Sequence, residues 1–265
     1  MFNLDNFVFE HDKYDLFEGM TSISAVIKSI VEGLSDRRII AVLCSLDRVK
    51  QKSREIAFLK RNAEVMGFDV LEVSSDFIDK LTLGDTHGGI VAICTKRSFP
   101  SISVNNLTST SFYALIDGIE DPYNFAYSIR SLYAAGVDGI ILPQRNWMDY
   151  SGVVARSSAG TSELTNIYVG DTIDAVKTLK DNGFKVVCAS IRDSVSIYEY
   201  DFNVPVLLIV GGEKRGISRK LLDLSDTNVR IDYGRDFMGS LPSASAISVI
   251  GFEIARQKSL FKNKS

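Results

Sequence analysis

A glycine-rich segment with charged side chains follows a strongly apolar run in the last third of the chain. Residues 206–218 read VLLIVGGEKRGIS, so that Gly211 and Gly212 come directly after the apolar run and Glu213 follows them. A short β-rich run that ends in paired glycines is typical of a buried strand that delivers a loop to the edge of a sheet. Ligands of open α/β sheets bind beyond the carboxyl ends of the strands, so we expect a small-molecule site at this loop.

The loop differs from a phosphate-binding loop. Gly211 and Gly216 have P-loop spacing, but Ile217 stands where the lysine of that motif would be, and Glu213 would repel a phosphate. Because glycines allow main-chain groups to approach a ligand closely, the loop favours a neutral or cationic ligand. Alternatively, Gly211, Gly212 and Gly216 serve only as turn formers, and Glu213 is an exposed acid of that turn.

Two α/β units surround this loop in the sequence. A βαβαβ alternation ends near residue 96, and six further strands interleaved with helices occupy residues 112–258. Polar residues without periodicity lie between them. We therefore predict a small α/β domain over 1–98, a linker over 99–110, and a second domain over 111–265 with a mostly parallel sheet covered by helices on both faces.

Composition limits the class of protein. The formal net charge of −3 gives no global attraction to nucleic acid, so RNA or DNA binding would depend on local patches. Cys44, Cys94 and Cys188 each lie in an apolar run, which predicts buried free thiols, and with only His11 and His87 we expect no metal site. The acidic start and the lack of a run of about 20 apolar residues predict a cytoplasmic protein without a membrane span.

Three segments of the second domain together resemble the SpoU, or TrmH-type, RNA ribose methyltransferases of the SPOUT superfamily. They are DGIEDPYNFAYSIR at 117–130, VGGEKRG at 210–216, and Ile231 followed by SLPSASA at 240–246. SSAGTSEL at 157–164 is also similar to a family segment. The first domain is similar, through GMTSISAV at 19–26 and HGGIVA at 87–92, to the substrate-binding domain that these enzymes often carry.

The resemblance implies a methyl donor, a fold and an assembly. The donor is S-adenosylmethionine, held by main-chain atoms within a deep C-terminal trefoil knot, and the active site forms at the interface of an obligate homodimer. Without the resemblance, an unknotted doubly wound sheet would be expected, because knots are essentially absent from proteins. The cofactor-binding residues that the resemblance implies are Gly211, Gly212, Gly216, Ile231, Leu241 and Ser245.

The resemblance implies catalytic roles for Asn124, Arg130, Glu213 and Ser240. A guanidinium group hardly deprotonates, so we expect Arg130 to stabilise the RNA phosphate and the developing alkoxide rather than act as a base. Asn124 and Arg130 are six residues apart, about 120° around a helix axis, so a shared site needs the loop end of the helix or a second chain. Apart from the resemblance, Arg130 reads as a solvated helix residue and Asn124 as a capping residue.

One position departs from the family pattern. Pro242 replaces an asparagine of the third motif, which removes an amide side chain and a backbone donor. Proline is well suited to begin a helix, and we predict the last helix over 242–258. Either Ser240, Ser243 or Ser245 takes the role of the asparagine, or the activity is altered.

We expect a ribose 2′-O-methyltransferase that acts on ribosomal RNA, which the additional N-terminal domain favours. The alternatives are a tRNA ribose methyltransferase and a non-catalytic RNA-binding protein on the same scaffold. A dinucleotide-dependent oxidoreductase is disfavoured because no G-x-G-x-x-G follows the first strand of either unit. The expected RNA contacts are Arg145, Arg156, Lys214 and Arg215, together with Lys50, Lys52 and Arg54 on the outer face of a helix predicted over 49–66.

Overall fold

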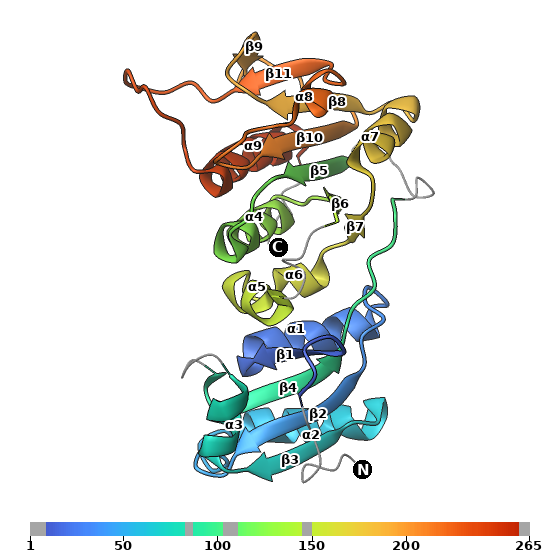
Figure 1. Ribbon diagram of the computed structural model, residues 1–265, viewed down its shortest axis with the longest axis vertical. Helices are drawn as coiled ribbons and strands as arrows, with labels where there is room; N and C mark the ends of the chain where they lie inside the picture. The colour runs from blue at the N-terminus through green and yellow to red at the C-terminus, as the bar shows by residue number, and fades with distance from the viewer. Residues whose placement is uncertain (1–8, 83–86, 103–110, 145–149, 260–265) are drawn as a thin grey trace. The chain divides into compact units, whose positions relative to one another are not determined.

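The computed structural model describes residues 9–82, 87–102, 111–144 and 150–259 (Figure 1). These residues form two compact units. The N-terminal unit contains the described residues up to 98 together with 150–164, and the C-terminal unit contains those from 99 to 144 and from 165 onward. The segment 150–164, which the sequence analysis assigns to the second domain, therefore packs within the N-terminal unit.

The N-terminal unit is built on a mixed four-stranded sheet in the order β1-β4-β2-β3. Strand β4 is antiparallel to both of its neighbours, whereas β2 and β3 are parallel. The strands are β1 (Tyr14–Glu18), β2 (Ile39–Ser45), β3 (Asp69–Val73) and β4 (Ile90–Thr95). The helices are α1 (Gly19–Val31), α2 (Ser53–Met66), α3 (Ser75–Leu81), α5 (Ser151–Ser157) and α6 (Thr161–Leu164).

Strand β1 was not predicted, because a carboxylate occupies its buried face. Asp15 and Phe17 point into the unit, so the strand lacks an apolar alternation. The guanidinium of Arg37, which is 2% exposed, binds Asp15 at 2.5 Å and Glu163 of α6 at 2.9 Å. A buried charge needs such partners, and here they join β1 and α6 to the segment before β2.

The C-terminal unit contains a seven-stranded sheet in the order β7-β6-β5-β10-β8-β11-β9. Every pairing between neighbouring strands is parallel. The strands are β5 (Phe112–Asp117), β6 (Gly139–Leu142), β7 (Ile167–Val169), β8 (Lys185–Ala189), β9 (Ser194–Ser196), β10 (Val206–Gly211) and β11 (Thr227–Arg230). The helices are α4 (Pro122–Ala134), α7 (Thr172–Asp181), α8 (Arg219–Leu222) and α9 (Ser243–Gln257).

Helices cover both faces of this sheet, and its central strand β10 is buried along its whole length. Val176 and Leu179 of α7 and Leu221 of α8 pack with alternate residues of the strands on one face. On the other face α9 packs against β10 and α4, and Ser248 donates a hydrogen bond to Ser131 at 2.7 Å. The predicted mostly parallel α/β sheet is confirmed, with one strand more than predicted, because β9 has only three residues.

Three smaller features complete the fold. Cys44, Cys94 and Cys188 are free and buried, as predicted, and burial raises the pKa of the Cys44 and Cys188 thiols to about 11. Among the described helices, none combines the length and the apolar character needed to cross a bilayer. The described part of the chain also has no group of three or more His, Cys, Asp or Glu side chains placed to hold a metal ion.

Candidate active site

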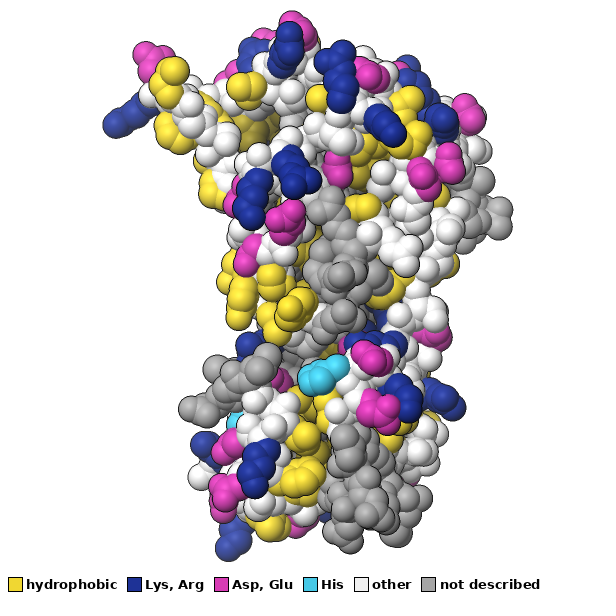
Figure 2. Space-filling model, viewed as in Figure 1, with side chains coloured by type: hydrophobic (Ala, Val, Ile, Leu, Met, Phe, Trp, Pro, Cys, Tyr) yellow, Lys and Arg dark blue, Asp and Glu magenta, His cyan; other side chains and the backbone are white. Residues whose placement is uncertain are grey.

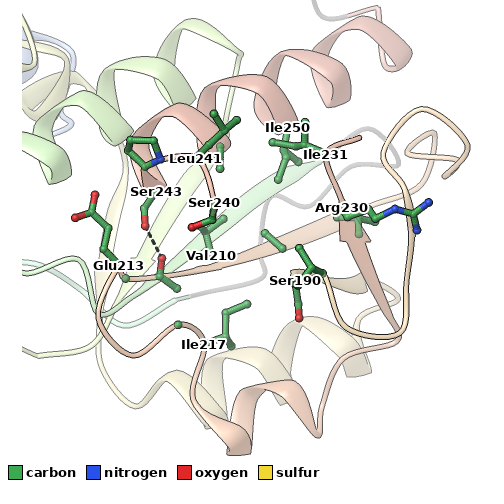
Figure 3. A pocket seen from close by; sticks show the side chains of 18 of the residues that line it. Ser190, Val210, Glu213, Ile217, Arg230, Ile231, Ser240, Leu241, Ser243 and Ile250 are labelled. Carbon is green, nitrogen blue, oxygen red and sulfur yellow. Dashed lines mark hydrogen bonds between the residues drawn. The ribbon is translucent and has the colours of Figure 1, made fainter. Parts of the chain in front are cut away.

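A cavity of about 500 Å³ lies at the carboxyl ends of β10, β8 and β11 in the C-terminal unit (Figure 3). These three strands are neighbours in a parallel sheet, so their ends meet at one edge, where α/β proteins bind ligands. The start of α9 and the chain before it close the remaining side. The lining segments are residues 189–191, 210–213, 216–217, 229–231, 233 and 240–243, with Ala246 and Ile250 of α9.

The loop after β10 is fastened to the connection between β5 and α4. The Gly212 N–H donates to the Asp117 carbonyl at 2.7 Å, and the Ser218 N–H donates to the Asp117 carboxylate at 3.0 Å. Farther along, the Asn124 amide donates to the Glu213 carboxylate at 3.2 Å. The two family motifs on these segments are thus brought into direct contact, with Asp117 holding both ends of the glycine loop.

The glycines of this loop have identifiable structural roles. A Cβ on Gly211 would come within 2.2 Å of the Gly216 main chain, and one on Gly212 within 1.9 Å of the Gly118 carbonyl oxygen. Gly216 has a φ of 63°, which side-chain-bearing residues adopt at a cost. The loop can therefore close on itself and on the β5–α4 connection only with glycine at these positions.

The beginning of α9 forms the opposite wall and is tied to the end of β10. The Ser243 hydroxyl, in a residue that is 7% exposed, donates to the Gly211 carbonyl at 3.0 Å (Figure 3). Pro242 occupies the capping position of α9 with extended backbone and also lines the cavity. The Leu241 N–H donates to the hydroxyl of Tyr233 at 3.2 Å, which fixes the incoming chain against the same wall.

The charges at the cavity favour a ligand that is not anionic. Glu213 is exposed on the lining loop, whereas the Arg230 guanidinium points away from the cavity (Figure 3). Arg230 donates to the Asp232 carboxylate at 2.9 Å and to the Ser194 carbonyl at 2.5 Å. Hydrogen bonding by Ser196, and to a lesser extent the charge of Arg230, lowers the pKa of Asp232. Asp232 therefore stays ionised at neutral pH and keeps Arg230 engaged.

Residues 111–252 match the model of the SpoU rRNA Methylase family. The chain belongs to this family. Residues 16–100 match a second model, described as RNA 2′-O ribose methyltransferase substrate binding. The resemblance seen in the sequence is thereby confirmed for both parts of this SpoU family chain.

Relatives and solved structures agree with this assignment. The chain is 26% identical over 251 residues to the 23S rRNA (guanosine-2′-O-)-methyltransferase RlmB of Shewanella oneidensis, covering 93% of this chain and 98% of that protein. It is 30% identical over 152 residues to a provisionally assigned TrmH family tRNA/rRNA methyltransferase of Staphylococcus saprophyticus, covering 57% of this chain and 61% of that protein. The crystal structure of an AdoMet-bound rRNA methyltransferase from Sinorhizobium meliloti has the same fold, with a TM-score of 0.77 at 23% identity over 95% of this chain and 89% of that one.

The structure gathers most of the sequence-predicted site residues at the cavity. Five of the six expected cofactor residues line it, namely Gly211, Gly212, Gly216, Ile231 and Leu241. Ser245 is exposed on α9 and does not line it. Glu213 and Ser240 line the cavity, and Asn124 reaches it through Glu213 rather than capping α4, a role that Asp121 fills. Arg130 is exposed on α4 and is not among the lining residues.

The expected RNA contacts have different surroundings. Arg156 binds Glu18 at 2.7 Å within the N-terminal unit, and Lys214 binds Glu120 at 3.3 Å, while Arg215 is exposed. Arg145 lies outside the described residues. Helix α2 begins at Ser53 and not at residue 49, because the chain turns through residues 46–52. Lys50 and Lys52 therefore precede the helix and Arg54 lies in its first turn; Lys52 binds Glu55 at 3.5 Å.

Several lining residues were missed by the sequence analysis. Ser190 and Ile191 follow β8, and Arg230 and Tyr233 belong to the end of β11 and the chain after it. The signal that could have found them is their position directly after a predicted parallel strand, since all such strand ends share one edge. Asp117, which binds the glycine loop without lining the cavity, also lies at the end of a strand, β5.

Proposed function

We propose that this SpoU family chain transfers the methyl group of S-adenosylmethionine to a ribose 2′-hydroxyl of ribosomal RNA. The observation that carries the proposal is the cavity at the ends of β8, β10 and β11, lined by the residues of two family motifs. Ribosomal RNA is favoured over tRNA because the RlmB relative, a 23S rRNA enzyme, aligns with 93% of this chain. Both units thus have a counterpart in one rRNA methyltransferase.

The cavity fits S-adenosylmethionine in size and chemistry. Its volume of about 500 Å³ lies in the range of small-molecule sites. Ile191, Ile217, Leu241 and Ile250 give it apolar walls suited to a purine ring. Glu213 contributes a carboxylate, and Arg230, the basic residue among the described lining residues, turns its head group away from the cavity. The bound cofactor supplies a methyl group on a positively charged sulfur.

Asn124 and Glu213 are the residues of this chain that prepare the site for the acceptor. The amide of Asn124 holds the Glu213 carboxylate at 3.2 Å and fixes it at the rim of the cavity. A carboxylate fixed in this way can orient a ribose hydroxyl by accepting its hydrogen bond, and positioning of this kind supplies a large part of catalysis. Ser240 lines the wall just before Pro242 and provides the hydroxyl that replaces the missing asparagine amide.

Arg130 acts in the site of a partner subunit within a homodimer. On α4 it lies about 9 Å along the axis and about 120° around it from Asn124, so one chain does not present both to one cavity. The exposed surface of α4 carries Tyr123 and Tyr127, at 45% and 47%, and neighbouring α9 exposes 43% of Phe252. This aromatic surface supports a homodimer through α4 and α9, in which each Arg130 stabilises the phosphate and alkoxide at the other cavity.

The family also implies a trefoil knot in the C-terminal unit and action on RNA in the cytoplasm. The path of the chain supports the knot: after β10 it passes to β11 beyond β8, and then returns so that Ser243 meets Gly211 and α9 meets α4. In this arrangement the knot consists of the chain after β10, the chain after β11 and the start of α9, which are also the segments that line the donor cavity.

Calorimetric titration with S-adenosylmethionine tests donor binding. The full chain should bind the donor, and Ala246→Trp, which places a large side chain in the cavity, should abolish binding. Ser245→Trp is the matched control, because the adjacent Ser245 is exposed and lies outside the cavity. Circular dichroism must report folded protein in each case. Absence of binding by the unaltered chain, or equal binding by Ala246→Trp, would reject the proposed donor site.

A further inference from the structure

The chain between β11 and α9 projects from the C-terminal unit as an arm, residues 232–239 (Figure 1). Both ends of the arm lie at the cavity. Ile231 and Tyr233 line the cavity at its start, and Ser240 and Leu241 line it at its end. Residues 234–239 do not line the cavity. The middle of the arm therefore lies beside the proposed donor site without being part of it.

The tip of the arm carries two exposed apolar side chains. Phe237 is 57% exposed and Met238 is 104% exposed, the latter being as accessible as in an extended peptide. Figure 2 shows hydrophobic side chains at this tip beside basic and acidic ones. Arg235 and Asp236 offset each other, and Asp232 is paired with Arg230. The arm thus offers apolar surface with little net charge.

The ring of Phe237 is held in a defined orientation despite its exposure. The ring of Tyr233 meets it edge-on, with centroids 5.6 Å apart and planes at 60°. A Cβ on Gly239 would come within 2.7 Å of the Phe237 ring, so the ring rests on the main chain at Gly239. Tyr233 is itself fixed by the Leu241 N–H at 3.2 Å. Phe237 is therefore linked through Tyr233 to the wall of the cavity.

We propose that Phe237 is a stacking platform for a base of the RNA substrate, next to the nucleotide whose ribose enters the cavity. This inference rests on the proposed function: RNA must approach the cavity, and both ends of the arm lie at it. Aromatic side chains stack on unpaired bases with little dependence on sequence. The defined orientation of the ring lowers the entropy lost when a base stacks on it.

A second copy of this chain fits the tip less well. A stable protein interface buries about 800 Å² on each partner, and Phe237 and Met238 alone offer much less. Tyr123 and Tyr127 of α4 and Phe252 of α9 are exposed on two helices that pack together, so a subunit interface has an alternative place there. An RNA base, in contrast, needs only one ring face.

Kinetics of methyl transfer to deproteinised ribosomal RNA, from a strain lacking this protein, test the platform. Phe237→Ala and Phe237→Leu should each raise KM about tenfold, whereas Phe237→Trp should stay within about twofold of the unaltered chain. Tyr198→Ala is the control, because Tyr198 is 58% exposed in the same unit and does not line the cavity. Its KM, and the affinity of every variant for S-adenosylmethionine, should be unchanged.

Three results would overturn the platform. The first is a KM of Phe237→Leu equal to that of the unaltered chain. The second is a loss of S-adenosylmethionine affinity in Phe237→Ala. The third is a change in the sedimentation of Phe237→Ala that indicates an altered assembly. If the unaltered chain transfers no methyl group, the proposed function fails separately. In that case filter binding of the same RNA tests the stacking role of Phe237 without methyl transfer. Weaker binding by Phe237→Ala supports this role, and equal affinity of the two proteins for the RNA rejects it.

Discussion

Ser243 joins the two walls of the donor cavity, so its removal should loosen the site and lower stability. Ser243→Ala deletes a hydroxyl that lies 3.0 Å from the Gly211 carbonyl, in a residue that is 7% exposed. A buried acceptor that loses its partner costs about 1–3 kcal/mol. At about 2–4 °C for each kcal/mol in a protein of this size, we expect Tm to fall by about 2–12 °C.

The same change should weaken donor binding, because the Gly211 carbonyl belongs to the cavity that the donor would fill. A loss of about 1 kcal/mol in preorganisation corresponds to a dissociation constant about fivefold higher, measured by calorimetry with S-adenosylmethionine. Ser245→Ala is the matched control, because Ser245 is exposed two residues farther along the same helix. Unchanged Tm and donor affinity in Ser243→Ala, or equal losses in both variants, would refute the reasoning.

Three further predictions concern the assembly, the N-terminal unit and RNA binding. Arg130→Ala and Glu213→Ala should each abolish methyl transfer. When equal amounts of the two variants are refolded together, about half of the dimers are mixed and each mixed dimer has one intact shared site, so about a quarter of the activity should return. No recovery would exclude shared sites. Arg37→Ala removes the buried ion-pair partner of Glu163 and one of the two cationic partners of Asp15, which keeps Lys96 at 2.8 Å, and it should lower the free energy of unfolding by about 3–5 kcal/mol. Arg38→Ala, at an exposed residue, should change it little in denaturant titrations. Reversing the charge of three basic residues should weaken RNA affinity and reduce its salt dependence in filter binding, and unchanged affinity would reject that surface. These residues are Lys50, Lys52 and Arg54.

The sequence was sufficient to predict the strand and loop at the centre of the site. Strand β10 is apolar because both of its faces are covered, and such a run followed by Gly211 and Gly212 has few alternatives. The hydrogen bonds that hold this loop could not be predicted in the same way. Asp117 accepts a hydrogen bond from Ser218 across 101 residues of sequence, and no local pattern specifies such a contact.

Side-chain direction explains the difference between the two serines of α9. The helix begins at Ser243, whose hydroxyl faces Gly211, and two residues turn a helix by about 200°. Ser245 therefore faces solvent although it belongs to the same motif. The first residue of a helix is among the least certain features of a sequence-based prediction, and a shift of one or two residues changes which serine faces the cavity.

Polar residues on buried faces explain the missing first strand. Asp15 lies where an alternating pattern would have an apolar residue, and its partner Arg37 is 22 residues away in the sequence. The segment around Glu163 resembles part of the methyltransferase domain, yet its carboxylate binds Arg37 of the N-terminal unit. The segment also packs on β1 and α1, and Ala155 belongs to the core of the N-terminal unit, so long-range contacts that the order of elements does not reveal place it there.

Transfer of labelled methyl from S-adenosylmethionine to ribosomal RNA of a strain lacking this protein tests the central claim most directly. A methyl group on a ribose 2′-oxygen blocks alkaline cleavage of the adjoining phosphodiester bond, so the labelled product should be an alkali-resistant dinucleotide. The unaltered chain should give this product and Glu213→Ala should not. Label on a base in alkali-sensitive nucleotides, or no transfer by a chain that binds the donor, would contradict the account.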